Sequence, residues 1–293
     1  MEAKAIMRNY WRWIVCLLLL GANGAVWYAA RLEDRGTILT LSVLDVGQGD
    51  AIFIDAPNGN QLLLDGGPPG QVVSALSSVM PFYDRSIDLL ALSHPHLDHF
   101  GGLIDVLARY EVGGVVTSGT EGVAPEYKNF KNAEKTAGQE EIFLREGTRI
   151  VMDHDVYLDV LFPASDVSDA TPHNGMLVMR LTYASTSVLL TGDMEENLEG
   201  YLLKYKPESL GSDVLKVGHH GSKTSTSEPF LAVVNPEIAL ISLGATNKYG
   251  HPNEETLEIL ERHGVKIYRT DESGTISLTI DGSVPGSYFL SDK

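Results

Sequence analysis

The chain of 293 residues is 43% hydrophobic and 21% charged, so it can bury a sizeable core and is not a mostly disordered protein. Its 39 acidic and 22 basic residues give a formal net charge of -17, which repels phosphate backbones and excludes a basic protein that coats nucleic acid. The single cysteine, Cys16, excludes both an intrachain disulfide framework and a thiolate metal site.

The first segment, residues 1–36, is predicted to be an N-terminal membrane anchor. Residues 13–30 form an uncharged stretch whose length meets the lower limit for a bilayer span, and aromatic residues lie at both of its ends. Basic residues precede it, so the positive-inside rule predicts a single-pass protein of the bacterial cell membrane with the following domain outside the cytoplasm. A cleaved signal peptide and a secreted domain are the alternative, because the most apolar part, residues 14–20, is short.

Residues 37–293 are predicted to form one α/β domain in which strands and helices alternate. The predicted strands cover residues 37–46, 51–55, 61–64, 89–92, 115–117, 156–162, 177–183, 187–191, 214–217, 238–242, 267–269 and 275–280. The predicted helices cover residues 102–110, 126–137, 195–204, 229–234 and 254–263. Polar residues follow several of the apolar runs directly. Since the loops at strand ends of α/β sheets assemble functional sites, we expect the chemistry at one rim of the domain.

The strongest local signal is the sequence His-Pro-His-Leu-Asp-His at residues 94–99. It places His94, His96, Asp98 and His99 within six residues of one another, directly after a buried strand. Imidazole and carboxylate ligands suit zinc, manganese or iron, and a tight turn can direct several of them at one point. We therefore predict a metal site, in which His94 and His96 serve one metal while Asp98 and His99 serve an adjacent one.

Other segments accompany this turn, and together they resemble a known family. They are Asp45-Val-Gly-Gln-Gly-Asp50, Leu64-Asp-Gly-Gly67, Thr191-Gly-Asp-Met-Glu195, His219-His-Gly-Ser-Lys-Thr224 and Tyr249-Gly-His-Pro252. The set is similar to metallo-β-lactamase-fold hydrolases and, more closely, to the extracellular hydrolase domain of the ComEC family of competence proteins. The matching segments run from about residue 38 to residue 280. The resemblance implies an α/β fold of the four-layer αββα type, here preceded by the predicted transmembrane helix.

The resemblance also implies roles for single residues. Asp193 would bridge two metals, and Asp65 would support a ligand beside them. His173 would complete the first metal, and either His219 or His220 would complete the second; the sequence leaves open which of the two does so.

Two departures from the family bear on the cofactor. ComEC proteins usually have Asp where this chain has His96, and often have Asn where it has His173. The chain is therefore closer to the general dinuclear pattern, and we expect two divalent metal ions, Zn²⁺ or Mn²⁺. Two metals roughly 3.5–4 Å apart can hold a bridging hydroxide that attacks the substrate.

Residues around the predicted centre offer groups that could bind an anion. The Ser/Thr-rich segment 221–227 precedes a predicted helix, so its amides and hydroxyls could hold a phosphate, with Lys223 adding a positive charge. His251 could contact the phosphate or protonate the leaving oxygen. A helix-capping loop and a surface-loop histidine are the plain alternatives. The predicted substrate-binding residues are Ser222, Thr224 and Asn247, and the predicted catalytic residues are Asp98, Lys223 and His251.

Asp45, Gln48 and Asp50 are harder to interpret. They either belong to a tight turn or support the metals from behind their ligands. Glu195 is predicted to lie on a solvated helix face.

These features predict a metal-dependent phosphodiester hydrolase, a ComEC-like nuclease that acts outside the cytoplasm, with single-stranded DNA as a candidate substrate. A metallohydrolase of a lactam, lactone or thioester would share the metal centre and is the first alternative. The second is a non-catalytic accessory module of a DNA-uptake channel. Because the chain has at most one predicted membrane helix, any uptake role would need a separate competence channel protein as partner.

Overall fold

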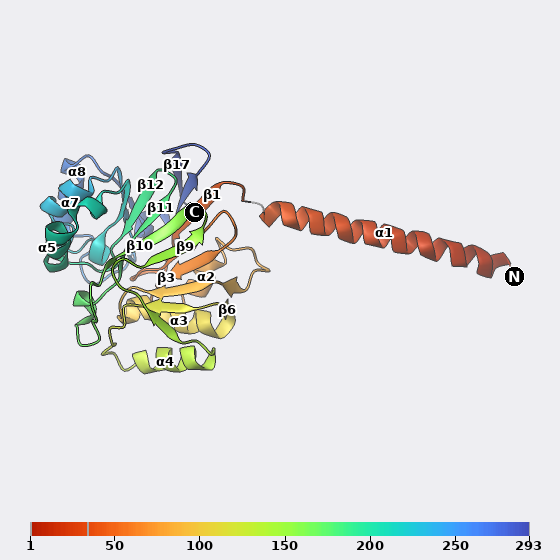
Figure 1. Ribbon diagram of the computed structural model, residues 1–293, viewed down its shortest axis with the longest axis horizontal. Coiled ribbons are helices and arrows are strands. Elements are labelled where there is room, and N and C mark those ends of the chain that lie inside the picture. Colours follow the sequence, from red (N-terminus) through yellow and green to blue (C-terminus); the bar gives the residue numbers. More distant parts are fainter. Residues whose placement is uncertain (1, 34, 293) are drawn as a thin grey trace.

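The computed structural model describes residues 2–33 and 35–292, and the strands within these ranges form two large stacked β-sheets (Figure 1). The first sheet has eight strands in the order β17-β16-β1-β2-β3-β5-β7-β8, and the second has seven in the order β15-β14-β13-β12-β11-β10-β9. Two short strands, β4 (Ser86–Ile87) and β6 (Glu111–Val112), pair separately.

The strands of the first sheet are β1 (Ile38–Val43), β2 (Ile52–Asp55), β3 (Gln61–Leu64), β5 (Leu89–Leu92), β7 (Val115–Thr117), β8 (Glu141–Phe143), β16 (Ile276–Asp281) and β17 (Tyr288–Asp292). Those of the second are β9 (Arg149–Asp153), β10 (Val156–Phe162), β11 (Val178–Tyr183), β12 (Thr186–Leu190), β13 (Val214–Lys216), β14 (Ile238–Ile241) and β15 (Lys266–Arg269). Strands β3, β5, β7 and β8 run parallel to one another, as do β12 to β15.

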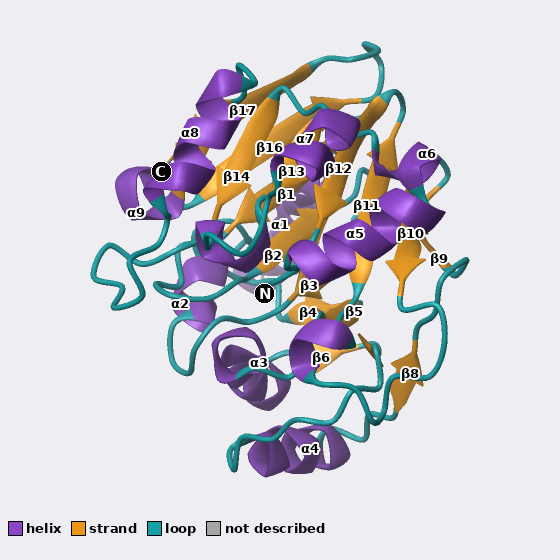
Figure 2. Ribbon diagram, turned by 90° about the vertical axis from the view of Figure 1, so that its left-hand side faces the viewer, coloured by secondary structure: helices purple, strands orange, loops and turns teal. Residues whose placement is uncertain are grey.

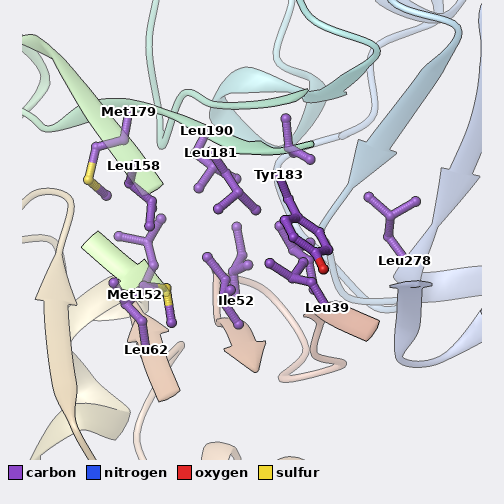
Figure 3. Packing of buried hydrophobic residues seen from close by; sticks show 14 of the residues in the cluster. Leu39, Ile52, Leu62, Met152, Leu158, Met179, Leu181, Tyr183, Leu190 and Leu278 are labelled. Carbon is purple, nitrogen blue, oxygen red and sulfur yellow. The ribbon is translucent and has the colours of Figure 1, made fainter. Parts of the chain in front are cut away.

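The main core lies between the two sheets (Figure 3). Along β1 the inward residues are Leu39, Leu41 and Val43, and along β10 they include Val156 and Leu158, all of them completely buried. This spacing of two follows from the pleat of a strand, which turns successive side chains to opposite faces. The alternation in the sequence therefore decides which side of each strand faces the second sheet.

Helices cover the outer face of each sheet, which gives an α/β fold with two further apolar cores (Figure 2). The helices α2 (Val72–Leu76), α3 (Leu97–Arg109) and α4 (Tyr127–Thr136) lie on the first sheet. The helices α5 (Glu196–Tyr205), α6 (Pro207–Leu210), α7 (Glu228–Val234) and α8 (Glu254–Arg262) lie on the second. The short elements η1 (Pro172–Asn174), η2 (Gly218–Gly221) and α9 (Thr270–Ser273) connect strands.

The N-terminal helix α1 (Glu2–Glu33) extends away from the sheets, and its described side chains from Tyr10 to Tyr28 are exposed (Figure 1). In the part of the chain that the structure describes, no helix is both long and apolar enough to span a bilayer. This finding contradicts the predicted single-pass anchor, and the membrane location derived from that anchor is left without support. The physical reason is the composition of the helix, because Gly21, Asn23 and Gly24 follow directly on its short apolar part.

One helix begins earlier than its sequence pattern predicts, and this matters for the site. The sequence predicts a helix from residue 102, whereas α3 begins at Leu97 with the extended residue His96 as its N-cap. Asp98 and His99 therefore lie in the first helical turn instead of in a loop. Two adjacent glycines, Gly101 and Gly102, hide the helical pattern, and both pack against the loop at Gly66 and Pro69 where a larger residue would clash.

Candidate metal centre

Seven His and Asp side chains meet where the carboxyl ends of the parallel strands reach one rim of the domain. His94 follows β5, Asp193 follows β12, and His220 follows β13. The two sheets thus contribute to one centre, as expected for chemistry carried on strand-end loops. His219 and His220 both adopt left-handed backbone conformations, with φ of 46° and 53°. Successive non-glycine residues in this region are unfavourable, and such strain is typical of functional sites.

The first group of potential ligands consists of His94, His96, His173 and Asp193, and one donor atom from each lies within 4.8 Å of the others. His94 Nε2 lies 2.9 Å from His96 Nδ1 and 3.6 Å from Asp193 Oδ2. Three imidazoles and one carboxylate are a ligand set suited to a divalent transition metal.

The second group consists of Asp98, His99 and His220, again with donor atoms within 4.8 Å of one another. His220 Nε2 lies 3.5 Å from Asp98 Oδ2 and 3.6 Å from Asp193 Oδ1, while His99 Nε2 lies 3.3 Å from Asp193 Oδ2. Asp193 therefore faces both groups, one oxygen toward His220 and the other toward His94 and His99. It occupies the position of a carboxylate that could bridge two cations.

His219 does not join the second group. Its Nδ1 lies 3.2 Å from Glu195 Oε1, and its Nε2 is 3.9 Å from Asp193 Oδ2. The choice between the two neighbouring histidines, which the sequence leaves open, falls on His220 by this geometry.

Several buried polar atoms at the centre have no hydrogen-bond partner among the described residues. They are His99 Nε2, His173 Nε2, Asp193 Oδ1 and His220 Nε2. Buried polar atoms are nearly always paired, so four orphans aimed at one point need an explanation, and bound cations would supply it. The donor set fits two divalent metal ions, although metal binding itself stays a prediction.

A layer of hydrogen bonds fixes the rings of the potential ligands. Asp65 Oδ2 lies 2.8 Å from His99 Nδ1, and both oxygens of Asp65 accept hydrogen bonds from Ser93, at 2.7 and 2.6 Å. His220 Nδ1 lies 2.8 Å from the carbonyl oxygen of Ser242, to which it can donate. Protons held on Nδ1 leave the Nε2 lone pairs free to face the centre. Asp65 thus lies where the resemblance implies a supporting role.

The two carboxylates of the 45–50 turn, Asp45 and Asp50, lie in different environments in the structure. Asp50 is buried, and its Oδ1, which has no hydrogen-bond partner, lies 3.4 Å from His220 Nδ1. Its other oxygen pairs with the buried ammonium of Lys216 at 2.7 Å. Asp45 is exposed and accepts a hydrogen bond from the Gly47 amide, so for this residue the structure favours the tight turn over support of the metals.

The charges at the centre shift the pKa values of its groups strongly. Burial alone would raise the pKa of Asp193, but His99 and His220 beside it hold that pKa well below its usual range. Burial would lower the pKa of His220, yet Asp193 and the other neighbouring carboxylates raise it to about 10. Burial, together with His99, holds the pKa of His94 well below the usual value. The centre therefore stabilises positive charge between its carboxylates, where cations would replace the protons.

The Ser/Thr-rich segment after His220 does not form the predicted phosphate cradle. The amides of Thr226 and Ser227 at the start of α7 donate to the carboxylate of Glu199, the latter at 3.0 Å. The Thr224 hydroxyl donates to Glu195 Oε1 at 2.7 Å, and the buried Ser222 hydroxyl lies 3.0 Å from Thr224 Oγ1. An internal carboxylate thus occupies the place predicted for a phosphate, and the loop's hydroxyls are engaged within the protein.

Of the three other residues predicted to contact the substrate, Asn247, Lys223 and His251, only His251 lines the cavity at the centre. The Asn247 side chain braces its own loop, donating to the carbonyls of Gly244 at 3.1 Å and His251 at 2.8 Å. Lys223 is exposed and is not among the residues that line the cavity at the centre. His251 does line that cavity, and its ring centroid lies 5.7 Å from that of His219.

Glu195 is a site residue that the sequence pattern does not reveal. It is the N-cap of α5, two residues after Asp193, and its Oε2 lies 3.8 Å from His173 Nδ1 while Oε1 contacts His219. It therefore holds two imidazoles on the open side of the centre. A run of acidic residues at a helix start is usually solvated, and only the spacing to Asp193 distinguishes Glu195 from its neighbour Glu196.

Comparisons with known proteins agree with this geometry. Residues 44–245 match the family model described as the metallo-beta-lactamase superfamily. ComE operon protein 3 of Bacillus subtilis is 33% identical over 264 residues, covering 84% of this chain and 33% of the relative. Competence protein ComA of Neisseria gonorrhoeae is 32% identical over 240 residues, covering 80% of this chain and 31% of the relative. The chain thus spans about a third of the length of these relatives.

A solved structure supports the fold alone. The metallo-beta-lactamase fold protein YhfI from Bacillus subtilis superimposes with a TM-score of 0.53 at 13% sequence identity, covering 81% of this chain and 98% of YhfI.

Proposed function

The chain belongs to the metallo-beta-lactamase superfamily, and from this membership and the geometry of its centre we propose that it hydrolyses phosphodiester bonds with the help of two divalent metal ions. The observation that carries the proposal is the position of Asp193 between two complete groups of His and Asp ligands.

The seven potential ligands would form two sets, one for each metal ion. His94, His96 and His173 would hold one ion, Asp98, His99 and His220 the other, and Asp193 would contact both. Two bound cations, Zn²⁺ or Mn²⁺, would supply Lewis-acid chemistry that neutralises charge developing on a phosphoryl group. Asp65 and Ser242 keep the Nε2 atoms of His99 and His220 directed at the ions through the hydrogen bonds on their Nδ1 atoms.

Two further histidines face the substrate side of the cavity. His219 and His251 both line it, and neither belongs to the two ligand groups. Glu195 holds His219 Nδ1, so the Nε2 of His219 points into the centre. We assign these two imidazoles to the non-bridging and leaving oxygens of the phosphate, where they would donate hydrogen bonds as charge accumulates.

A phosphodiester substrate is favoured over a carbon substrate by the relatives. One is named a competence protein, and another, from Haemophilus influenzae, is named recombination protein 2 and is 32% identical over 241 residues, 80% of this chain and 28% of the relative. Both names point to nucleic acid, whose backbone is a phosphodiester. Because the chain is strongly acidic, single-stranded DNA would be held locally, at the metal ions, instead of along a basic track.

The test uses the full chain loaded with Mn²⁺ or Zn²⁺. We expect metal-dependent cleavage of bis(p-nitrophenyl) phosphate and of end-labelled single-stranded DNA. His96→Ala and Asp98→Ala should each lose about one metal ion per chain, measured by elemental analysis, and most of the activity. His154→Ala, at an exposed turn, is the matched control and should keep both. Hydrolysis of a chromogenic lactam without cleavage of either diester would overturn the proposal, as would full activity in both ligand variants.

A further inference from the structure

A second cavity adjoins the metal centre. The cavity at the centre has a volume of about 190 Å³, and its neighbour is larger, about 380 Å³. The two share Gln48, Asp98 and Tyr249 in their walls, so a ligand bound at the centre can continue into the neighbouring space. None of the potential ligands other than Asp98 lines this second cavity.

The walls of the second cavity have a mixed character. Pro68 and the first residue of α3, Leu97, form an apolar side, while Thr246 and Lys248 bring a hydroxyl and a positive charge. Tyr249 lines both cavities, and 70% of its surface is exposed. A large aromatic ring so exposed at the edge of a site is unusual for a side chain that only packs the fold.

The loop that carries Tyr249 is held in place from within. Asn247 Oδ1 accepts hydrogen bonds from the amides of Tyr249, at 3.3 Å, and His251, at 3.1 Å. The rings of Tyr249 and His251 are nearly parallel, with centroids 6.0 Å apart and an interplanar angle of 17°. The loop backbone is therefore held, and the tyrosine ring presents a flat face beside the position assigned to the phosphate.

We propose that the second cavity is a subsite for the nucleoside next to the scissile phosphate, with its base stacked on Tyr249. This inference deepens the proposed phosphodiesterase function and depends on it for the position of the phosphate. Aromatic stacking suits any base, because every base has a π face, so the subsite accepts nucleosides without strong base preference. Lys248 lines the same cavity, where it can contact the next phosphate of a longer chain.

Two diesters with the same leaving group test the proposal. Thymidine 5′-(p-nitrophenyl phosphate) carries a nucleoside, whereas methyl p-nitrophenyl phosphate carries none. We expect the wild-type chain to prefer the nucleoside diester by about tenfold in kcat/KM, mainly through KM, as one stacked base predicts. Tyr249→Leu should abolish the preference, so that its kcat/KM values for the two diesters become equal, and Tyr249→Phe should retain it. Tyr205→Ala, an exposed tyrosine on α5, is the control.

Calorimetric binding of thymidine 5′-monophosphate and of methyl phosphate to the metal-loaded chain gives a readout apart from catalysis. The nucleotide should bind about tenfold more tightly, and Tyr249→Leu should remove the difference. Equal binding of both ligands, or a preference that survives Tyr249→Leu, would overturn the subsite. Failure of the wild-type chain to cleave either diester would instead overturn the phosphodiesterase function, while the calorimetric comparison would still decide whether the subsite exists.

Discussion

Lys216 and Asp50 form an ion pair inside the protein, with the ammonium nitrogen 2.7 Å from Asp50 Oδ2 and both side chains shielded from solvent. The lysine is the last residue of β13, an otherwise apolar strand of the second sheet, and the aspartate precedes β2 of the first. The pair leaves Asp50 Oδ1 facing His220. A buried cation thus connects the two sheets directly behind the metal centre.

Replacing this lysine by an apolar residue of similar length should destabilise the fold. Lys216→Met leaves the Asp50 carboxylate buried and unpaired, and such a change costs about 3–5 kcal/mol in the free energy of unfolding. The double variant Lys216→Met, Asp50→Asn should recover part of this loss. Urea denaturation of the metal-free chain measures both, with the exposed Lys135→Met as control. If Lys216→Met lowered the free energy of unfolding by less than about 1 kcal/mol, the ion pair would contribute little to stability.

Glu195 should matter for chemistry more than for folding. Glu195→Gln keeps the size of the side chain but weakens the contacts to His219 and His173, and loss of such a supporting carboxylate lowers activity or metal affinity about 10- to 100-fold. Glu196→Gln, on the exposed neighbouring residue, should leave both unchanged. Diester kinetics and metal titration measure the effect. If Glu195→Gln and Glu196→Gln had the same activity and the same metal affinity, Glu195 would be a solvated residue with no role at the centre.

Two glycines of the turn before β2 provide a matched steric test. A Cβ at Gly49 would lie 2.2 Å from the carbonyl oxygen of Asp98, whereas one at Gly47 would meet nothing within 4 Å. Both residues have positive φ, so each alanine variant carries backbone strain of about 1 kcal/mol or more. Gly49→Ala should cost about 2 kcal/mol beyond Gly47→Ala and should displace Asp98. Denaturation and metal content measure this, and equal losses would contradict it.

The stability of the chain should depend on pH through Glu134 on α4. Burial and the nearby Glu141 raise the pKa of Glu134 to about 7, above the value of an unfolded glutamate. A raised carboxyl pKa means that the folded state binds the proton more tightly, so the stabilisation is present below about pH 4.5 and is lost as pH rises toward 7. Glu134→Gln should therefore stabilise the chain at pH 8 by roughly 1–2 kcal/mol, allowing for solvent screening.

Denaturation midpoints at pH 5 and pH 8 measure this prediction. The advantage of Glu134→Gln over wild type should shrink at pH 5, while Glu140→Gln, on an exposed residue of the same region, should show no such change. If the difference in midpoint between Glu134→Gln and wild type were the same at pH 5 and pH 8, Glu134 would not be the cause of the pH dependence.

Local patterns were sufficient to predict the strands that position the site. Apolar runs such as residues 61–64 and 89–92 correspond to β3 and β5, since buried strands leave a hydrophobic signal in few residues. The edge strands β8 and β9 were missed because solvent on one side dilutes that signal: Ile142, Phe143 and Val151 are exposed. At the N-terminus the uncharged stretch of residues 13–30 predicts an anchor, whereas no described helix is both long and apolar enough to span a bilayer.

The site was predictable in its residue types but not in its details. A cluster of histidines and aspartates predicts a metal site, yet the choice of His220 over His219 depends on a left-handed backbone that the sequence does not encode locally. Likewise, a Ser/Thr-rich loop reads as a phosphate cradle until Glu199, on a different helix, proves to hold its amides. Such tertiary hydrogen bonds join residues that are distant in the chain, beyond the reach of any local pattern.

The position of Asp193 between the two ligand groups has a consequence for the stability of the whole domain. Asp98 and His99 belong to the half of the chain that builds most of the first sheet, whereas Asp193 and His220 belong to the half that builds the second. Cations held there would join the two halves at one rim. Separation of the sheets at that rim would then require release of both ions, so the slowest backbone amides to exchange with solvent should depend on metal concentration as well as on the core.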